Sequence, residues 1–412
     1  MSAEETVELS GHIIDSGVFS ALLDDIHEYG ADFTITRFEV GHHSGDPSWA
    51  QVRVSTETAD DLQRLLMRLQ THGANLVDIG EPQIVAADAD GVFPDGFYST
   101  TNLETQLRLG GRWVSVERPE MDCGLVVEDG VTGPTVRTVP MADIRAGMRV
   151  VCSAQGVRVT LPQPSESDRG FGFMDSQVSS EKPQALLVRQ VADEMRATRA
   201  AGQKVLWVGG PAVVHTGAAP AMVALVDGGY VDVLFAGNAL ATHDIEAALY
   251  GTSLGVDLVA GRGVQHGHEH HIRAINQIRR AGSIRAAVDT GVLTGGVMHA
   301  LVRGGHDFVL VGSVRDDGPL PDVFTDVLEG QRAMRARLDG IGFCLMVATT
   351  LHSVATGNLL PASVPLVCVD INPATVTKLA DRGSVQARGI VTDVGLFLHQ
   401  LAAELTDYRV GP

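Results

Sequence analysis

Cysteine is scarce in this 412-residue chain, and the four that occur, Cys123, Cys152, Cys344 and Cys368, are far apart. No two of them have the CxxC spacing that zinc ribbons and thioredoxin-like motifs use. Cys344 and Cys368 stand in apolar runs, where a thiol is most simply a small buried hydrophobic group. This cysteine usage favours a reducing, cytoplasmic location.

Long hydrophobic runs are also missing. The sequence has no apolar stretch of about 18 residues, which is the length that a membrane-spanning helix needs. The first residues, MSAEETVELSG, are acidic and polar and do not resemble a signal peptide. Basic residues are few, because 31 Lys and Arg stand against 50 Asp and Glu, for a net charge of -19. This balance disfavours nucleic acid and anionic membranes as partners, and solubility explains it most simply.

The stretch from residue 205 to 255 combines two apolar runs of strand length, VLWV and VDVLFA, each ending in glycine and each followed by helical spacing. Four further runs of this kind, FVLVGS, CLMVATT, LVCVDIN and GIVTDV, follow it. Strands that are nearly continuous in apolar residues are typical of a parallel sheet with both faces covered. We therefore expect residues 184–408 to form an α/β domain with a doubly wound, mostly parallel Rossmann-like sheet.

The preceding residues indicate two smaller domains. Residues 6–90 contain strands and amphipathic helices in the order β-α-β-β-α-β, which predicts a ferredoxin-like α+β unit. Residues 91–165 contain short β-branched runs separated by Gly, Pro and Asp, which predict a small all-β unit. A chain of this length is long enough for two or three domains.

No GxGxxG motif occurs, so the usual dinucleotide fingerprint is absent. Parallel α/β sheets nevertheless bind ligands at the carboxyl ends of their strands, where glycine admits a phosphate to the backbone. Gly209-Gly210 and the segment Gly237-Asn238-Ala239 stand at two such ends. Asp316 and Asp317 follow another strand, on the loop SVRDDGPLPD.

The last three strands add further polar positions at their ends. The segment ATTLHS, residues 348–353, opens a helix whose amides would meet a pyrophosphate. Asp370 ends the next strand about 20 residues on, where an acid would grip a ribose diol and repel a 2′-phosphate. The segment TDV, residues 392–394, ends the last strand. An Asp at a strand end is more often a helix N-cap than a ligand, but four such positions in one sheet favour a nucleotide site.

Histidines are densest in RGVQHGHEHHIRAIN, which contains His266, His268, His270 and His271. A zinc site would need a clearer carboxylate or cysteine partner, so a loop leading into a helix near Glu269 is the simpler interpretation and no metal is predicted. Arg273 follows on that helix and is a candidate to pair with a substrate carboxylate.

His215 follows the first glycine-ended strand, in GPAVVHTG. Its position makes it a candidate for proton transfer, and a core histidine without a chemical role is an equally good interpretation.

Several motifs together resemble one family. They are VHTGA, AGNALATHDIE, ALYGTSLG, RAINQIRRAGSI, RDDGPLPDV, LHSVATGNLLP, VDINPATVTKLADRGS and GIVTDVGLFL. These motifs are similar to the archaeal-type ornithine cyclodeaminases, whose domain also forms the C-terminal part of cyanobacterial arginine dihydrolase/ornithine cyclodeaminases. GHIIDSGVFSALLDDI, DFTITRFEVG and DPSWAQVRV resemble the conserved region of lysine-oxoglutarate reductase/saccharopine dehydrogenase (LOR/SDH). FYSTTN, MDC and SSEKP also match, and the sheet domain resembles deoxyhypusine synthase.

The resemblance implies a tightly held NAD and a set of cofactor contacts that follow the motifs. The implied contacts are Asn238, Ala239, Asp316, Thr350, Leu351, His352, Asp370, Asp393 and Val394. One departure is VATT before LHSVATGN, where relatives often carry a methionine.

The resemblance also implies a reaction, in which L-ornithine becomes L-proline and ammonia. NAD accepts a hydride from the α-carbon, the δ-amine displaces ammonia, and the hydride returns to the cyclic imine. His215 or Asp317 would move protons, and Arg273 would hold the substrate carboxylate. Enzymes of this kind are commonly symmetric homo-oligomers.

Two other functions remain open at this stage. One is a different NAD-dependent enzyme for a basic amino acid or polyamine, such as a lysine cyclodeaminase or an amine dehydrogenase. The other is a non-catalytic module that senses NAD or an amino acid through the ferredoxin-like unit.

Overall fold

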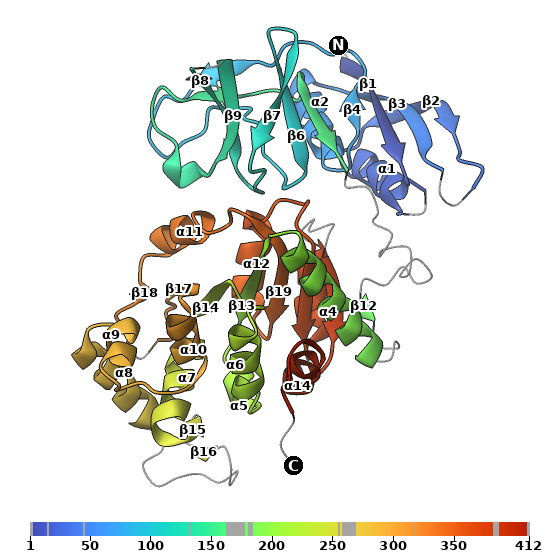
Figure 1. Cartoon of the computed structure of the whole chain (residues 1–412). Helices are drawn as coiled ribbons and strands as arrows, with labels where there is room; N and C mark the ends of the chain where they lie inside the picture. The colour runs from blue at the N-terminus through green and yellow to red at the C-terminus, as the bar shows by residue number, and fades with distance from the viewer. Residues whose placement is uncertain are drawn as a thin grey trace. The chain divides into compact units, whose positions relative to one another are not determined.

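The computed structural model describes most of the chain and divides it into two compact units (Figure 1). The described residues are 3–14, 16–43, 46–131, 133–161, 178–179, 184–253, 256–257, 269–316, 318–381 and 387–409. The first unit comprises Met1–Asp175 together with Asn358–Ser363. The second unit comprises Ser176–Gly357 and Val364–Pro412. The predicted division into three domains stays a prediction.

The first unit begins with a ferredoxin-like sheet, as predicted. Its strands have the order β2-β3-β1-β4, and the pairs β1–β3, β2–β3 and β1–β4 are antiparallel. The elements are β1 (Ala3–Gly11), α1 (Val18–Glu28), β2 (Asp32–Glu39), β3 (Ser48–Thr56), α2 (Ala59–Gln70) and β4 (Asn75–Leu76).

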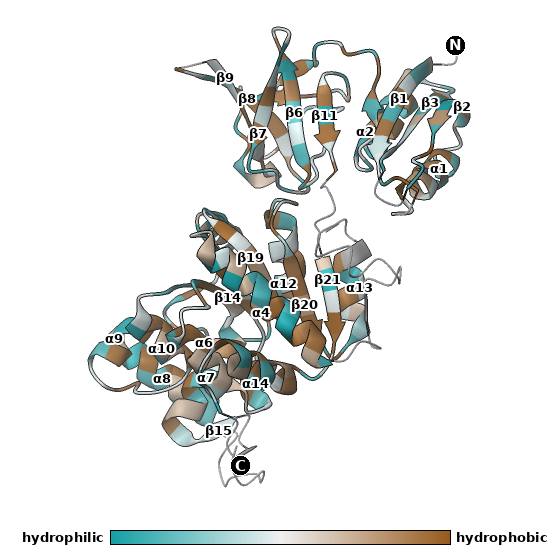
Figure 2. Ribbon diagram, turned by 45° about the vertical axis from the view of Figure 1, so that its right-hand side comes forward, coloured by the Kyte–Doolittle hydropathy of each residue, from teal (hydrophilic) through white to brown (hydrophobic). Residues whose placement is uncertain are grey.

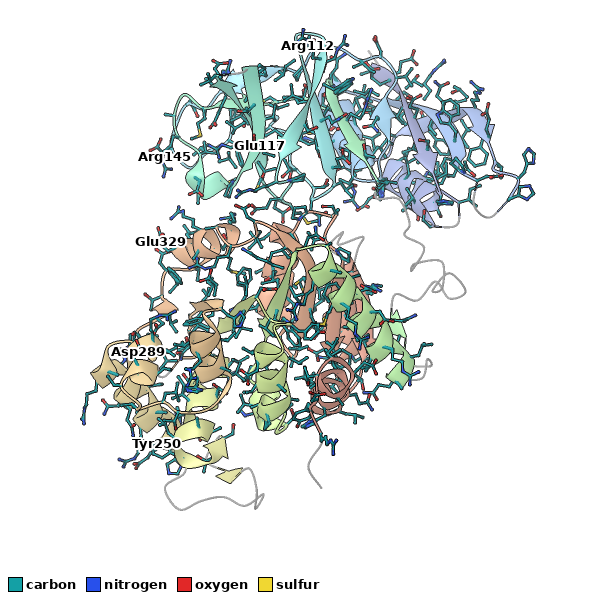
Figure 3. The ribbon with its side chains drawn as sticks, in the orientation of Figure 1. Arg112, Glu117, Arg145, Tyr250, Asp289 and Glu329 are labelled. Carbon is teal, nitrogen blue, oxygen red and sulfur yellow. The ribbon has the colours of Figure 1, made fainter. Side chains whose placement is uncertain are left out.

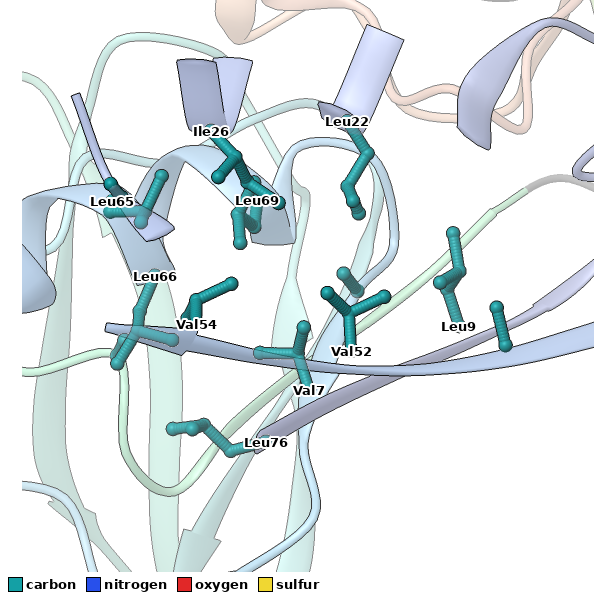
Figure 4. Close-up of a cluster of buried hydrophobic side chains, with 14 of the residues drawn as sticks. Val7, Leu9, Leu22, Ile26, Val52, Val54, Leu65, Leu66, Leu69 and Leu76 are labelled. Atoms are coloured by element: carbon teal, nitrogen blue, oxygen red, sulfur yellow. The ribbon is translucent and has the colours of Figure 1, made fainter. Parts of the chain in front are cut away.

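The core of this sheet follows from two periodicities. Alternate residues of β3 are buried, and a stripe of leucines on α2, including Leu65 and Leu69, packs on Val7 and Val52 (Figure 4). Thr58 caps α2, because its hydroxyl accepts a hydrogen bond from the amide of Asp61 at 3.1 Å.

A seven-stranded sheet follows in the same unit, with the order β11-β6-β7-β9-β8-β10-β5. Its elements are β5 (Ile84–Ala86), β6 (Glu104–Leu109), β7 (Arg112–Glu117), β8 (Gly124–Gly130), β9 (Gly133–Val139), η1 (Met141–Asp143), β10 (Arg149–Val151) and β11 (Val157–Thr160). β5 pairs with β10 of this sheet, although it precedes the predicted boundary at residue 90.

The segment Asn358–Ser363 belongs to this first unit although it is far away in sequence. The amide of Met121 donates to the carbonyl of Asn358 at 3.0 Å, and the amide of Ala362 donates to the carbonyl of Asn102 at 2.7 Å. The side-chain amide of Asn102 donates to the carbonyl of Leu360 at 3.3 Å. The polar residues of FYSTTN and MDC therefore hold a returning stretch of chain.

The second unit is an eight-stranded parallel sheet with helices on its faces, in the order β12-β21-β20-β19-β13-β14-β17-β18. Its elements are β12 (Val178–Ser179), α4 (Gln184–Ala200), β13 (Lys204–Gly209), α5 (Ala212–His215), α6 (Ala219–Asp227), β14 (Val233–Gly237), α7 (Asn238–Tyr250), β15 (Thr252–Ser253), β16 (Val256–Asp257), α8 (His270–Ala281), α9 (Ile284–Asp289), α10 (Val297–Gly304), β17 (Asp307–Val311), β18 (Val323–Phe324), α11 (Val327–Arg335), β19 (Ile341–Val347), α12 (Thr350–Leu359), β20 (Leu366–Asp370), α13 (Pro373–Asp381), β21 (Ala387–Val391) and α14 (Val394–Leu405).

The strand order is that of a Rossmann fold, which confirms the predicted fold class. From β13 the chain adds β14 and β17 on one side, then returns to add β19, β20 and β21 on the other. The direction reverses between β13 and β19, where such sheets bind ligands. The apolar runs that predicted these strands are buried, and Figure 2 shows the central strands largely in brown.

The two strands at the reversal point are in close backbone contact. The amide of Gly210 donates to the carbonyl of Val347 at 2.9 Å. A Cβ on Gly210 would lie 1.8 Å from the carbonyl oxygen of Ala348, so only glycine fits there. Ala348 itself has a positive φ of 52°, which is uncommon for a residue with a side chain.

A buried carboxylate fixes α7 to α10. Asp244 is fully buried, and its two oxygens accept hydrogen bonds from the amides of Val297 and Met298, each at 2.8 Å. These amides belong to the first turn of α10 and would otherwise lack partners. Burial raises the pKa of Asp244 to about 6, against the effect of the two amides.

The contact at Gly210 generates a stability prediction. We expect Gly210→Ala to lower the free energy of unfolding by about 2 kcal/mol or more, because the added methyl group meets fixed backbone atoms. Chemical denaturation measures the change. Gly295→Ala is the matched control, since a Cβ on Gly295 meets nothing within 4 Å. Equal stability of the two variants would contradict the contact.

Candidate active site

The carboxyl edge of the eight-stranded sheet carries the predicted cofactor residues. Because the strands are parallel, the segments that follow β14, β17, β19, β20 and β21 all leave from this edge. The residues there are Asn238 and Ala239 after β14, Asp316 after β17, Thr350, Leu351 and His352 after β19, Asp370 at the end of β20, and Asp393 and Val394 after β21.

His352 connects three of these strand ends. A Cβ on Gly237 would lie 3.2 Å from Cε1 of His352, so the imidazole packs against the end of β14. Burial lowers the pKa of His352 below its ordinary value, and the nearby Asp316 carboxylate partly offsets that effect. Asp316 in turn accepts hydrogen bonds from the amide of Ser313 at 2.8 Å and from its hydroxyl at 3.3 Å.

Asn238 has a supporting role in the structure. It is buried at the first position of α7, and its Oδ1 accepts hydrogen bonds from the amide of Leu320 at 3.0 Å and the hydroxyl of Thr242 at 3.3 Å. The oxygen therefore holds the loop after β17 against α7. Within the described residues the NH₂ group of Asn238 donates no hydrogen bond, which makes that group the candidate donor toward a ligand.

Asp370 ends β20 with an exposed fraction of 9%. Its Oδ1 accepts a hydrogen bond from the amide of Asn372 at 2.8 Å. Thr350, at the start of α12, shares a hydrogen bond with Thr375 through their hydroxyl oxygens, which are 2.8 Å apart. Asp370, which is predicted to bind the ribose, and the start of α12, which is predicted to bind the pyrophosphate, are thus both held by hydrogen bonds to neighbouring residues.

Asp393 caps α14, because its Oδ1 accepts a hydrogen bond from the amide of Leu396 at 2.8 Å. A Cβ on Gly395 would lie 3.0 Å from Oγ1 of Thr216 and 3.1 Å from Oδ1 of Asp393. The start of α14 therefore packs closely against the end of α5. This packing brings His215, the residue before Thr216, to the same edge of the sheet.

His215 lies within a polar cluster that the sequence did not reveal. Its Nδ1 is 2.6 Å from the hydroxyl of Ser253, and its ring centroid is 4.8 Å from that of His243. Burial and, to a smaller extent, His243 lower the pKa of His215, while Glu246 acts in the opposite direction. The spacing of His243 and Glu246 at i and i+3 in ATHDIE would have been the available signal.

Arg273 lies on α8 and forms a salt bridge with Glu269, one turn earlier. Its side chain is 60% exposed. A role for Arg273 with a substrate carboxylate stays a prediction, and it would require the guanidinium to exchange Glu269 for the substrate. Asp317, His266 and His268 lie outside the described residues.

The described histidines of that segment have other partners. His270 is 2.8 Å from the hydroxyl of Thr252 and stacks on Tyr250, whose position at the end of α7 is labelled in Figure 3. Across the described parts of the chain, no group of three or more His, Cys, Asp or Glu is arranged to hold a metal ion. No helix within these ranges is both long and apolar enough to cross a bilayer.

The donors and acceptors at this edge fit a dinucleotide. Three helices, α7, α12 and α14, begin there, and the first amides of a helix favour an anion such as a pyrophosphate. Asp370 is placed to accept hydrogen bonds from a ribose diol. Exposed apolar side chains at the same edge offer surface for a ring; they are Leu351, Ile371 and Leu396.

Two cavities lie elsewhere in the structure and do not coincide with this edge. One of about 330 Å³ is lined by Glu4, Glu5, Thr6, Arg53, Val77 and Asp78. The other, of about 390 Å³, is lined by Gln277, Arg280, Ala281, Thr290 and Val292. Neither contains a residue of the candidate site.

Three family models match consecutive parts of the chain. Residues 189–401 match the model described as arginine dihydrolase ArgZ-like, C-terminal, Rossmann fold. Residues 104–188 match the first region of the same C-terminal part. Residues 4–103 match the LOR/SDH bifunctional enzyme conserved region.

Curated relatives match almost the whole chain. An ornithine cyclodeaminase of Methanothermobacter thermautotrophicus is 50% identical over 400 residues, which are 97% of each protein. The bifunctional arginine dihydrolase/ornithine cyclodeaminase AgrE of a Nostoc strain is 41% identical over 97% of this chain and 58% of AgrE.

Solved structures agree with these matches. The crystal structure of ArgZ, an arginine dihydrolase from the ornithine-ammonia cycle in cyanobacteria, has a TM-score of 0.85 and 37% identity, covering 98% of this chain and 58% of ArgZ. A ternary complex of AgrE with ornithine and NAD⁺ has a TM-score of 0.53 and 40% identity, covering 98% of this chain and 57% of AgrE. The chain therefore spans little more than half of these two proteins.

The proximity of Asp316 and His352 can be tested by titration. We expect the pKa of His352 to lie below the ordinary value of a histidine and Asp316→Asn to lower it further, because the variant removes the carboxylate that favours the imidazolium. Histidine-selective NMR measures the midpoint, with His352→Gln for assignment. Asp289→Asn, at the exposed end of α9 (Figure 3), is the control and should leave it unchanged. A higher midpoint in Asp316→Asn would contradict the arrangement.

Proposed function

The chain belongs to the ornithine cyclodeaminase family, and from this membership we propose that it converts L-ornithine to L-proline and ammonia with a tightly bound, recycled NAD. The family match confirms the resemblance indicated by the motifs. It also makes the chain an NAD-dependent enzyme of the ammonia-lyase type. The substrate, the product and the recycling of NAD are our proposal for this chain.

One observation carries the proposal: the predicted cofactor residues converge at the carboxyl edge of the sheet, beside His215. The ends of β14, β17 and β19 meet around His352, and α5 packs against the start of α14. A relative that is 50% identical over nearly its full length is an ornithine cyclodeaminase. An AgrE structure contains ornithine and NAD⁺ together, which supports the same pair of ligands here.

The cofactor residues have distinct proposed roles. The first amides of α12, at Thr350, Leu351 and His352, would hold the pyrophosphate, and the carboxylate of Asp370 would hold a ribose diol. Asn238, Ala239, Asp316, Asp393 and Val394 complete the set around them. When bound, NAD supplies a reversible acceptor for the hydride of the substrate α-carbon.

The remaining chemistry is proton transfer and orientation. Ornithine loses ammonia and gains a ring bond, so the reaction has no net oxidation. The α-ammonium group must lose a proton before its carbon can give up a hydride, and His215, whose pKa is lowered by burial, is the proposed base. Asp317 is the alternative base, and Arg273 is the proposed clamp for the carboxylate. A homo-oligomeric state stays a prediction.

Turnover of ornithine without added cofactor tests the function. We expect purified protein to release proline and ammonia in equal amounts from L-ornithine, with no accumulation of NADH. With L-ornithine deuterated at the α-carbon, the proline should retain deuterium at the same carbon, because the hydride that leaves is the one that returns. Mass spectrometry of the proline measures this retention.

Other outcomes would separate the alternatives. Accumulating NADH that carries the deuterium would indicate a net dehydrogenase. Faster turnover of L-lysine would indicate a lysine cyclodeaminase. Binding of ornithine without any product, with or without NAD, would indicate a sensing module and would contradict the proposal.

The cofactor site makes a separate prediction. Heat-denatured protein should release NAD close to one per chain, and Asp370→Asn should weaken NAD binding by about tenfold or more through loss of a charged hydrogen-bond acceptor. Titration calorimetry on stripped protein measures the affinity. Asp227→Asn, at the exposed end of α6, is the control. An unchanged affinity of Asp370→Asn for NAD would show that Asp370 does not contribute to the cofactor site.

A further inference from the structure

A histidine and a carboxylate on α7 form an ordered pair beside His215. Nδ1 of His243 lies 2.8 Å from Oε2 of Glu246, and the Glu246 side chain is fully buried. Because an ionised carboxylate only accepts hydrogen bonds, Nδ1 of His243 carries the proton in this pair.

Glu246 is held in position from its other oxygen. The hydroxyl of Thr252 donates to Oε1 of Glu246 at 3.0 Å. Since a hydroxyl has one proton, Thr252 accepts from Nδ1 of His270 at 2.8 Å. His270 stacks on Tyr250, and the hydroxyl of Tyr250 accepts a hydrogen bond from Gln277 at 2.7 Å. Burying a carboxylate costs free energy. Buried carboxylates that neighbouring elements orient, as β15 and α8 orient Glu246, are concentrated at functional sites.

The pair touches His215 through the ring of His243. The two ring centroids are 4.8 Å apart and the rings are inclined at 61°. On its other side, Nδ1 of His215 is 2.6 Å from the hydroxyl of Ser253, which follows Thr252 in β15. The same short strand therefore fixes both Glu246 and His215.

We propose that His243 and Glu246 are positioning residues that act on His215 in opposite directions, His243 against a positive charge on its ring and Glu246 in favour of one, and together tune His215 as the base for the substrate amine. This proposal rests on the proposed function. Ornithine gives one proton from its α-ammonium group to His215, and the N–H bond breaks as the imidazole N–H bond forms. His215 returns that proton to the departing ammonia when the C–N bond breaks. The δ-ammonium gives up one proton as the ring bond forms, and the released ammonia carries that proton away as ammonium, so the substrate cation yields zwitterionic proline and NH4⁺ and both protons and charge balance.

The groups around His215 act on it in these two directions. Among the described residues, the charged or titratable groups that act on His215 are His243 and Glu246 from α7, and His271 from α8 lies behind His243 at a ring separation of 6.3 Å. A proton on His243 lies beside the Glu246 carboxylate, while a proton on His215 is disfavoured by burial and by His243. Burial and His243 therefore both favour the neutral form of His215.

Two variants should shift the titration midpoint of His215 in opposite directions. In His243→Gln we expect the midpoint of His215 to rise, because the group that opposes a positive charge there is lost. In Glu246→Gln we expect it to fall, because the carboxylate that favours a charged His215 is lost. Histidine-selective NMR with His215→Gln for assignment measures both, and His306→Gln, at the opposite edge of the sheet, is the control.

Kinetics should follow the titration. The acid limb of kcat/KM for ornithine should move up in His243→Gln and down in Glu246→Gln, while His215→Gln should lose about 10²–10⁴-fold in kcat with its NAD retained. Glu246→Asp, which keeps the carboxylate, should move the acid limb of kcat/KM less than Glu246→Gln does. If His243 and Glu246 had only a structural role, their variants would change the stability of the protein and leave the titration midpoint of His215 unchanged.

The outcomes separate this inference from the proposed function. The titration needs no substrate, so it stands even if ornithine is not turned over. Normal ornithine turnover with an unmoved His215 midpoint in a folded His243→Gln variant would overturn the inference alone. Should Glu246→Gln fail to fold, His243→Gln decides the question, since the His243 side chain is partly exposed.

Discussion

The backbone contact between the ends of β13 and β19 is the constraint on which the carboxyl edge depends. Gly210 lies so close to Ala348 that a side chain would have no room, and the amide of Gly210 bonds to the preceding carbonyl of Val347. This contact fixes where α12 begins, and with it the amides of Thr350 to His352. The start of α12 and the turn that leads to His215 both follow directly from this junction of the sheet.

Much of the second unit could be predicted from local patterns. Apolar runs that end in Gly, Asp or Asn predicted buried parallel strands, and parallel strands share one edge, so Asn238, Asp370 and Asp393 could be grouped without coordinates. The ferredoxin-like order was predictable for the same reason, because its strands and helices alternate with clear periods.

The missed parts depend on contacts between distant residues. Ser253 meets His215 across 38 residues of sequence, and nothing near either residue announces the other. The strand at Ile84–Ala86 is likewise too short to specify its partner by itself, and it pairs with β10. Local patterns specify an element, while its partner is specified by packing over the whole fold.

Two buried carboxylates on α7 show how one helix serves both architecture and chemistry. Asp244 accepts two backbone amides of α10, and burial moves its pKa to about 6. Glu246, two residues on, instead meets the side chains of His243 and Thr252. Since residues two apart project to different sides of a helix, the first fixes the fold and the second orders polar side chains near the candidate base.

The membership of Asn358–Ser363 in the first unit has an evolutionary consequence. The chain leaves the second unit in the last turn of α12 and rejoins it before β20. Neither unit is therefore a continuous module that recombination could exchange with one cut. Replacing the first unit would require rebuilding α12, whose other end lies at the carboxyl edge of the sheet, so both units are expected to have been inherited together.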